Sequence, residues 1–181
     1  MGYPGKNHKQ YEKPTRKFEK QRQADEVKLI VTYGLRNKRE VWKSQSVLRR
    51  YRRAARDITA MGSAGSDPKA VETRRRQLLE SLERMGFVSA DAGIESVLTL
   101  RVEQYLERRL QTVVHRKGLA RSPKQARQFI THGHIMVGSR KVTIPGYQVS
   151  RAEEGQVCYA THSPMSNEVH PERARISKVG R

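Results

Sequence analysis

Positive charge is the dominant property of this amino-acid sequence. Lysine and arginine total 37 residues against 18 aspartates and glutamates, which gives a formal net charge of +19. Repulsion of this size opposes compaction of an isolated chain, and only 35% of the residues are hydrophobic. We therefore expect small cores rather than one large core, and a polyanionic partner, with nucleic acid as the leading candidate.

Other partner classes find no support in the sequence. No run of about 18 apolar residues predicts a membrane helix, and no signal-type apolar segment follows the N-terminus. Cys158 is the single cysteine, so it forms no internal disulfide and no paired-thiolate zinc site within one chain. We expect a soluble, cytoplasmic protein with no cofactor, no small-molecule substrate and no membrane contact.

Both ends of the chain have the composition of extensions. Residues 1–26 combine Gly, Pro, Lys and Gln with almost no aliphatic side chains, and residues 161–181 are polar and interrupted by proline. Neither segment has enough apolar surface to offset the entropy lost on ordering. We predict basic, disorder-prone ends that become ordered on a partner.

The first third of the folded region is predicted to be helical. An apolar cluster at residues 27–35 has Gly34 as its helix C-terminal residue, and residues 43–62 have the periodicity of one apolar helix face. After a Gly-Ser linker, Asp67 is a predicted N-cap, Pro68 occupies the first helical position, and Gly86 ends the helix. Residues 27–96 are thus expected to form a helical domain.

The polar side of the helix over residues 43–62 forms an arginine face. It carries five arginines offset only by Asp57: Arg49, Arg50, Arg52, Arg53 and Arg56. A solvated helix face ordinarily mixes charges of both signs, because pairs three or four residues apart stabilise the helix. The imbalance favours contact with phosphates over a merely solvated face.

A second folded unit is expected over residues 97–160. An apolar stripe predicts a helix over residues 97–118, and a short helix begins with Ser122 as N-cap, Gln125 in a capping box, and ends at Gly133. Apolar residues then alternate from Ile135 to Ile144 around a Gly138–Ser139 turn, which predicts a hairpin. The fold class is therefore α+β.

The candidate RNA-binding residues belong to the arginine face and to this second unit. In addition to the five arginines named above, they are Arg108, Arg109, Arg116, Lys117, Arg121, Ser122, Lys124, Gln125, Arg127, His132, His134, Arg140 and Lys141.

An ordered series of motifs resembles a known family. It comprises "YLERRLQTVV", "GLARSPKQARQFITHGHIMVG" and "RKVTIPGYQV" in the second unit, and "QYEKP" and "YGLRNKREVWKSQSVLRRYRRAAR" before it. The second unit resembles the S4 RNA-binding domain. Most of residues 11–160 resemble the small-subunit ribosomal protein family for which that domain is named, in its archaeal and eukaryotic form.

This resemblance implies a fold and a partner. The fold would be two packed helices facing a small, strongly bent sheet, attached to a helical domain. The function would be that of a structural constituent of the small ribosomal subunit, binding ribosomal RNA early at a junction in its 5′ part and nucleating assembly. The position would be beside neighbouring small-subunit proteins, near the place where messenger RNA enters.

Several residues have a second interpretation. His132 and His134 lie two apart and would share a strand face, but a metal site lacks a third ligand at suitable spacing. One of these histidines could instead cap the helix or satisfy the core. Arg127 could pair internally with Glu103 or Glu107, although its place on an exposed helix face near Lys124 favours RNA.

The aromatic residues and the overall function also have alternatives. Tyr51, Tyr105 and Trp42 are possible stacking platforms, but Tyr51 and Tyr105 lie on or beside apolar stripes, which favours the core. The resemblance also implies a rival class, because S4 domains occur fused to pseudouridine synthases, methyltransferases and a tyrosyl-transfer enzyme. No glycine-rich cofactor motif and no catalytic triad is present here. A free RNA-binding factor or an accessory RNA-modification protein is the remaining alternative.

Overall fold

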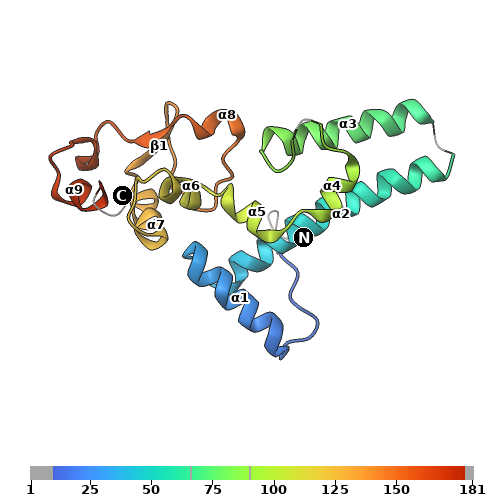
Figure 1. Cartoon of the computed structure of the whole chain (residues 1–181), viewed down its shortest axis with the longest axis horizontal. Coiled ribbons are helices and arrows are strands. Elements are labelled where there is room, and N and C mark those ends of the chain that lie inside the picture. The colour runs from blue at the N-terminus through green and yellow to red at the C-terminus, as the bar shows by residue number, and fades with distance from the viewer. Residues whose placement is uncertain (1–9, 66, 90, 178–181) are drawn as a thin grey trace, which may run out of the picture.

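The computed structural model describes residues 10–65, 67–89 and 91–177. Figure 1 shows an elongated molecule with a helical lobe at one end, a mixed lobe at the other, and α1 projecting from their junction. The helical lobe contains α2 (Lys38–Ser63), α3 (Pro68–Arg84) and α4 (Ile94–Thr99), and α1 spans Lys20–Tyr33. The predicted α+β class is confirmed by the small sheet of the mixed lobe.

The predicted helix boundaries in the first half are confirmed where end signals are present. The Asp67 side chain accepts a hydrogen bond from the Lys69 N–H at the start of α3, and Pro68 occupies the first turn. Gly34 follows α1 with φ 59°, and a Cβ there would lie 2.7 Å from Cβ of Pro123. Only glycine fits both the left-handed backbone and this close approach.

The helical lobe has its own core between α2, α3 and α4. Leu48 and Ala55 of α2 are buried with Leu82 of α3. The Phe87 ring lies 5.5 Å from Tyr105 and 6.4 Å from Tyr51, centroid to centroid. The core interpretation of these two tyrosines is therefore confirmed.

The helix predicted over residues 97–118 is wrong as a single element. The structure has α4, then α5 (Val102–Glu107), then α6 (Leu110–Arg116). Between α5 and α6, the N–H of Leu110 donates to the carbonyl of Tyr147 at 2.8 Å, and the N–H of Val149 donates to the carbonyl of Arg108 at 2.9 Å. This pairing with a distant segment interrupts the helix without changing its apolar spacing.

The mixed lobe places two helices against a three-stranded antiparallel sheet. Helices α6 and α7 (Pro123–Thr131) pack together, and the strands β1 (Ile135–Val137), β2 (Arg140–Lys141) and β3 (Val157–Tyr159) have the order β2-β1-β3. Val137 pairs with Arg140 across the predicted turn, which confirms the hairpin. The return strand is shorter than predicted, because it ends at Lys141 and Ile144 is 64% exposed. Helix α8 (Arg151–Glu154) precedes β3.

The segment after residue 160 is a packed part of the mixed lobe. It forms a 3-10 turn, η1 (Pro164–Ser166), and α9 (Pro171–Ser177). Met165 and Ile176 are buried in the same core as Ile130. The prediction of a polar tail is corrected for these residues, because two well-spaced apolar side chains are enough to dock the segment. At the other end, the predicted disorder is corrected for residues 20–26, which belong to α1, while residues 1–9 lie outside the described part.

This docking has a measurable consequence for stability. Ile176→Ala is expected to lower the free energy of unfolding by about 2 kcal/mol, because it removes a buried side chain at the edge of the core. Val169→Ala, at a side chain that is 85% exposed, is the control and should change it by less than about 0.5 kcal/mol. Urea denaturation measures both, and equal values would mean that α9 contributes nothing to the core.

Candidate nucleic-acid interface

Four of the five residues of the arginine face point to solvent. Arg49, Arg50, Arg53 and Arg56 are exposed on α2. Arg52 is the exception, because its guanidinium donates to the carbonyl of Leu100 in the helical lobe. The exposed face therefore has four of the five predicted arginines, because Arg52 joins α2 to the segment after α4.

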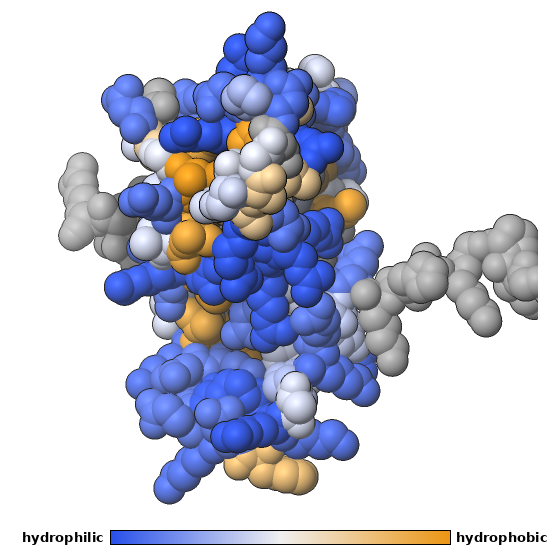
Figure 2. Space-filling model, turned by 90° about the vertical axis from the view of Figure 1, so that its right-hand side faces the viewer, coloured by the Kyte–Doolittle hydropathy of each residue, from blue (hydrophilic) through white to orange (hydrophobic). Residues whose placement is uncertain are grey.

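The segment at residues 10–12 borders the arginine face. Glu12 pairs with Arg49 at 2.8 Å, and its N–H donates to the Ser46 hydroxyl at 3.0 Å. A hollow of about 310 Å³ between this segment and α2 is lined by Arg50, Arg53 and Arg56 among others. Figure 2 views the molecule from the α2–α3 end and shows a mainly hydrophilic surface. The hollow leaves these three cations accessible to an anionic ligand.

The connection between α6 and α7 is a second basic surface. Lys117, Arg121 and Lys124 are exposed around it. Ser122 accepts a hydrogen bond from the Gln125 N–H at 3.2 Å, as predicted for the N-cap, and the Gln125 side chain accepts from the Arg121 N–H at 2.8 Å. Ser122 and Gln125 thus fix the backbone that presents the three cations.

Two further predicted arginines are held by carboxylates in the same lobe. Arg116 donates to both oxygens of Glu107, at 2.8 and 3.2 Å, and this hydrogen bonding lowers the pKa of Glu107. Arg108 is half-buried and pairs with Glu154 at 2.7 Å. The partner of Arg108 lies 46 residues away in sequence, so local charge spacing does not predict this pair.

Glu40, near the start of α2, joins the two lobes. Its Oε2 accepts a hydrogen bond from Arg109 Nη2 at 2.8 Å, and its Oε1 accepts one from Arg127 Nη2 at 2.9 Å. Arg109 is only 5% exposed, so its buried positive charge needs the Glu40 carboxylate as a counter-ion. Burial raises the pKa of Glu40, but the hydrogen bonds from Arg127 and Arg109 outweigh it and hold that pKa below its ordinary value.

Arg127 therefore forms an internal ion pair, although the partner is Glu40 rather than Glu103 or Glu107.

Two residues that join distant parts of the chain, Glu40 and Gln111, were not identified from the sequence. The Gln111 side-chain amide donates to the carbonyls of Gly34 at 2.8 Å and Pro123 at 2.9 Å. A polar residue inside the apolar run "RLQTVV" was the available signal. The contact of Arg109 and Arg127 with RNA stays a prediction.

The last four predicted residues lie on β2 and on the turn between α7 and β1. Arg140 and Lys141 are exposed on β2, and Arg140 lies 3.9 Å from Glu153. His132 is exposed, whereas His134 is half-buried, with Nδ1 2.9 Å from the Ser163 hydroxyl. Burial, followed by the neighbouring His132 and Lys141 charges, lowers the pKa of His134. One histidine thus satisfies the protein interior and the other faces outward.

Apart from Arg52, which is held by the Leu100 carbonyl, the predicted lysines and arginines fall into two sets. Six have a carboxylate oxygen within 4.0 Å: Arg49, Arg108, Arg109, Arg116, Arg127 and Arg140. Seven are exposed and have no such partner among the residues that the structure describes: Arg50, Arg53, Arg56, Lys117, Arg121, Lys124 and Lys141. We call these seven the unpaired cations. They are the side chains available to an external polyanion, because no neighbouring carboxylate competes for them.

Acid should weaken the junction between the lobes. The folded-state pKa of Glu40 lies below its ordinary 4.5, so the carboxylate stabilises the fold above that pH. This contribution is lost as the pH falls through the lowered pKa. We expect the urea midpoint to fall in that acid range, and the fall to be smaller in Glu40→Gln. Urea unfolding followed from neutral to acidic pH measures this, and identical pH profiles would contradict it.

Both the S4-like unit and the chain as a whole match known proteins. The S4 domain family matches residues 108–154, which run from the start of the mixed lobe to the end of α8. A protein of Methanospirillum hungatei named small ribosomal subunit protein uS4 is 58% identical over 181 residues, all of both chains. The chain belongs to the uS4 family. Proteins of the same name are 56% identical over all of both chains in Methanosphaerula palustris, and 49% identical over 96% of this chain and 98% of the relative in Haloarcula marismortui.

Membership of the uS4 family confirms the resemblance found in the sequence. No helix in the described ranges is long and apolar enough to cross a membrane. Within residues 10–65, 67–89 and 91–177, no group of three or more His, Cys, Asp or Glu is arranged to hold a metal ion. The uS4 relatives bear the name of a ribosomal protein and not of an enzyme.

Proposed function

We propose that this uS4 protein is a structural constituent of the small ribosomal subunit and that its unpaired cations bind ribosomal RNA. The observation that carries the proposal is the separation of the cations. Carboxylates neutralise the arginines that hold the fold together, whereas Arg50, Arg53 and Arg56 on α2 and Lys117, Arg121, Lys124 and Lys141 in the mixed lobe face outward.

The shape of the molecule supports a contact at more than one RNA helix. The two basic surfaces belong to different lobes, and Glu40 with its two arginines fixes the lobes relative to each other. A hollow of about 670 Å³ between them is lined by Arg50 and Lys43 of α2 and by Pro145 of the mixed lobe. A rigid protein with separated basic surfaces can hold two RNA segments at a junction, since phosphate contacts position without reading sequence.

The finer assignments rest on the family resemblance. They are early binding at a junction in the 5′ part of the small-subunit RNA, nucleation of assembly, neighbouring small-subunit proteins, a place near the messenger RNA entrance, and a cytoplasmic location. The uS4 relatives match over nearly the whole chain, so a free RNA-binding factor is not favoured.

The decisive experiment is a salt-titrated binding assay of the full chain. The ligand is a transcript of the 5′ domain of small-subunit ribosomal RNA, with transfer RNA and duplex DNA as competitors. Binding that survives both competitors is expected. Displacement by transfer RNA and duplex DNA as effective as displacement by unlabelled transcript would contradict the proposal, because non-specific charge alone would then account for the affinity.

Lys124 and Arg127 separate binding from stability. Lys124→Ala is expected to weaken binding to the transcript about fivefold and leave the free energy of unfolding unchanged, because Lys124 is exposed and pairs with no carboxylate in the part of the chain that the structure describes. Arg127→Ala should lower the free energy of unfolding, because it removes one of the two hydrogen-bond donors to Glu40. Filter binding and urea unfolding on both variants test this, and unchanged affinity in Lys124→Ala would remove α7 from the interface.

A further inference from the structure

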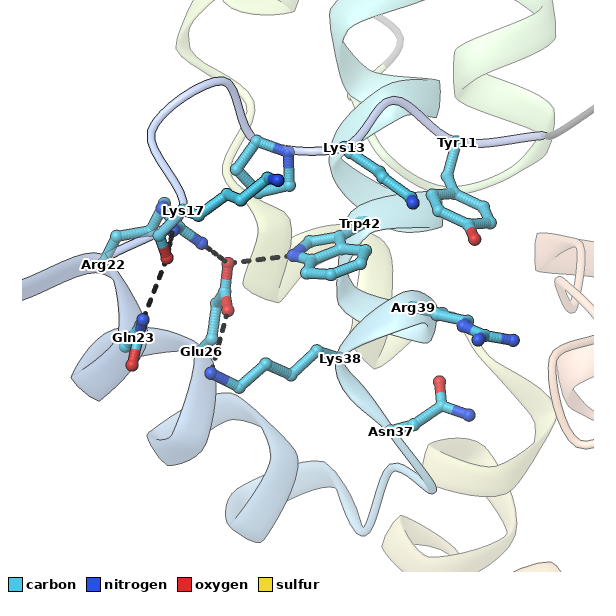
Figure 3. A pocket seen from close by; sticks show the side chains of 11 residues that line it. Tyr11, Lys13, Lys17, Arg22, Gln23, Glu26, Asn37, Lys38, Arg39 and Trp42 are labelled. Carbon is cyan, nitrogen blue, oxygen red and sulfur yellow. Dashed lines mark hydrogen bonds and ion pairs between the residues drawn. The ribbon is translucent and has the colours of Figure 1, made fainter. Parts of the chain in front are cut away.

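A cavity separate from the two hollows described above contains none of the candidate RNA-binding residues of the arginine face or of the second unit. The segment at residues 11–17 runs from beside α2 to the start of α1, and together with these two helices it lines a cavity of about 810 Å³ (Figure 3). We call it the arm cavity. Its size is within the range of small-ligand pockets in proteins. Its lining includes Tyr11, Lys13, Lys17, Glu26, Arg39 and Trp42.

A buried carboxylate organises the floor of the arm cavity. Glu26 is 1% exposed, and its Oε1 accepts hydrogen bonds from Trp42 Nε1 at 2.9 Å and Arg22 Nη1 at 2.6 Å. The Lys38 Nζ lies 3.5 Å from the other oxygen. Glu26 therefore fixes the indole of Trp42 by its N–H and offsets charge from Arg22 and Lys38 (Figure 3).

The segment at residues 11–17 is held in place beside Glu26 by hydrogen bonds from α1. Arg22 Nη2 donates to the carbonyls of Arg16 at 2.7 Å and Lys17 at 3.1 Å. The Gln23 side-chain amide donates to the carbonyl of Lys17 at 3.0 Å. Buried Glu26 thus holds Arg22, and Arg22 holds the segment, so the cavity is preorganised in the protein by itself.

The edge of the arm cavity is cationic and its wall is aromatic. Lys13, Lys17 and Arg39 are exposed, and no carboxylate of the described residues lies within 4.0 Å of their charged nitrogens. Trp42 is half-buried, and the Tyr11 ring lies 5.9 Å from it at a tilt of 35°. An acidic peptide would use the cations alone, whereas a nucleotide would use both the cations and the aromatic wall.

We propose that the arm cavity binds one unpaired nucleotide of the ribosomal RNA, with its base against Trp42 and Tyr11 and its phosphates on Lys13, Lys17 and Arg39. This inference rests on the proposed function and adds a recognition mode to it. The unpaired cations contact phosphates only, whereas the arm cavity distinguishes a single-stranded base from a base inside a helix.

Trp42 is the single tryptophan of the chain, so its fluorescence reports on the arm cavity directly. The full chain is titrated with a single-stranded RNA hexanucleotide, with an abasic hexanucleotide of equal charge, and with a hexaglutamate peptide. We expect the hexanucleotide to quench Trp42 and to bind about tenfold more tightly than the abasic strand, because stacking requires the base. Equal affinity for the two strands with unchanged emission, or tighter binding of the peptide, would overturn the inference.

Matched variants locate the effect. Lys13→Ala with Lys17→Ala should weaken hexanucleotide binding about tenfold, whereas Lys28→Ala with Lys69→Ala removes the same charge from exposed helix positions and should leave it within about twofold. Equal losses would assign the binding to overall charge. The two proposals can be refuted independently. If the chain binds the 5′-domain transcript specifically but Trp42 emission does not change, only the nucleotide site in the arm cavity is refuted. If the chain does not bind the transcript specifically, the proposed function is refuted.

Discussion

Arg50→Ala with Arg53→Ala is expected to weaken binding to the 5′-domain transcript about thirtyfold. Both arginines are exposed on α2 and line the hollow beside residues 10–12, with no carboxylate of the described residues competing for them. The estimate takes about 1 kcal/mol for each lost phosphate contact. The slope of log affinity against log salt should also become shallower by about 2, because two fewer counterions are released.

The matched control is Arg75→Ala with Arg76→Ala on α3. These substitutions also remove two positive charges. However, each arginine already has a carboxylate nearby, because Glu72 lies 3.8 Å from Arg75 and Glu80 lies 3.7 Å from Arg76. The control should change affinity by less than about threefold and leave the salt slope within about 0.5 of the parent chain. If the two double variants lose affinity equally, net charge governs binding and the arginine face has no special part in it.

Glu40→Ala is expected to lower the free energy of unfolding by about 3 kcal/mol. The substitution leaves Arg109, which is 5% exposed, without a carboxylate, and it removes the partner of Arg127 as well. Removing one partner of a buried ion pair costs more than the pair contributes, because an uncompensated charge stays in the interior. Urea denaturation with an unchanged m-value measures this loss.

The control for Glu40 is Glu80→Ala. Glu80 lies 3.7 Å from Arg76 on the surface of α3, where the side chains of both residues are mostly exposed. An exposed pair of this kind contributes about 0.5 kcal/mol or less. A loss in Glu40→Ala no larger than that in Glu80→Ala would show that the junction between the lobes does not depend on this carboxylate.

Local signals in the sequence predicted those parts of the fold that local physics determines. Asp67 and Ser122 cap their helices as expected, and Val137 pairs with Arg140 across the predicted turn. Each of these features depends on residues within a few positions of one another. The motifs at residues 105–149 also indicated the family correctly, because their order and spacing are more specific than composition.

Features that depend on distant partners could not be predicted in this way. Glu40 is 69 residues from Arg109 and 87 from Arg127, and nothing in the local pattern distinguishes it from a solvated helix glutamate. The division between α5 and α6 depends on backbone hydrogen bonds between this segment and both Tyr147 and Val149. The side chains of the segment keep the apolar spacing of one continuous helix, so the sequence gives no sign of the break. Pairing and burial of this kind appear only when the lobes are assembled.

Lysine labelling tests the central claim most directly. The full chain, free and bound to the 5′-domain transcript, is treated with an amine-acylating reagent, and the modification of each lysine is measured by mass spectrometry. We predict that Lys117, Lys124 and Lys141 lose reactivity in the complex, whereas Lys69, exposed at the start of α3, keeps it. Protection of Lys69 with continued labelling of the other three would contradict the assignment of the unpaired cations to ribosomal RNA.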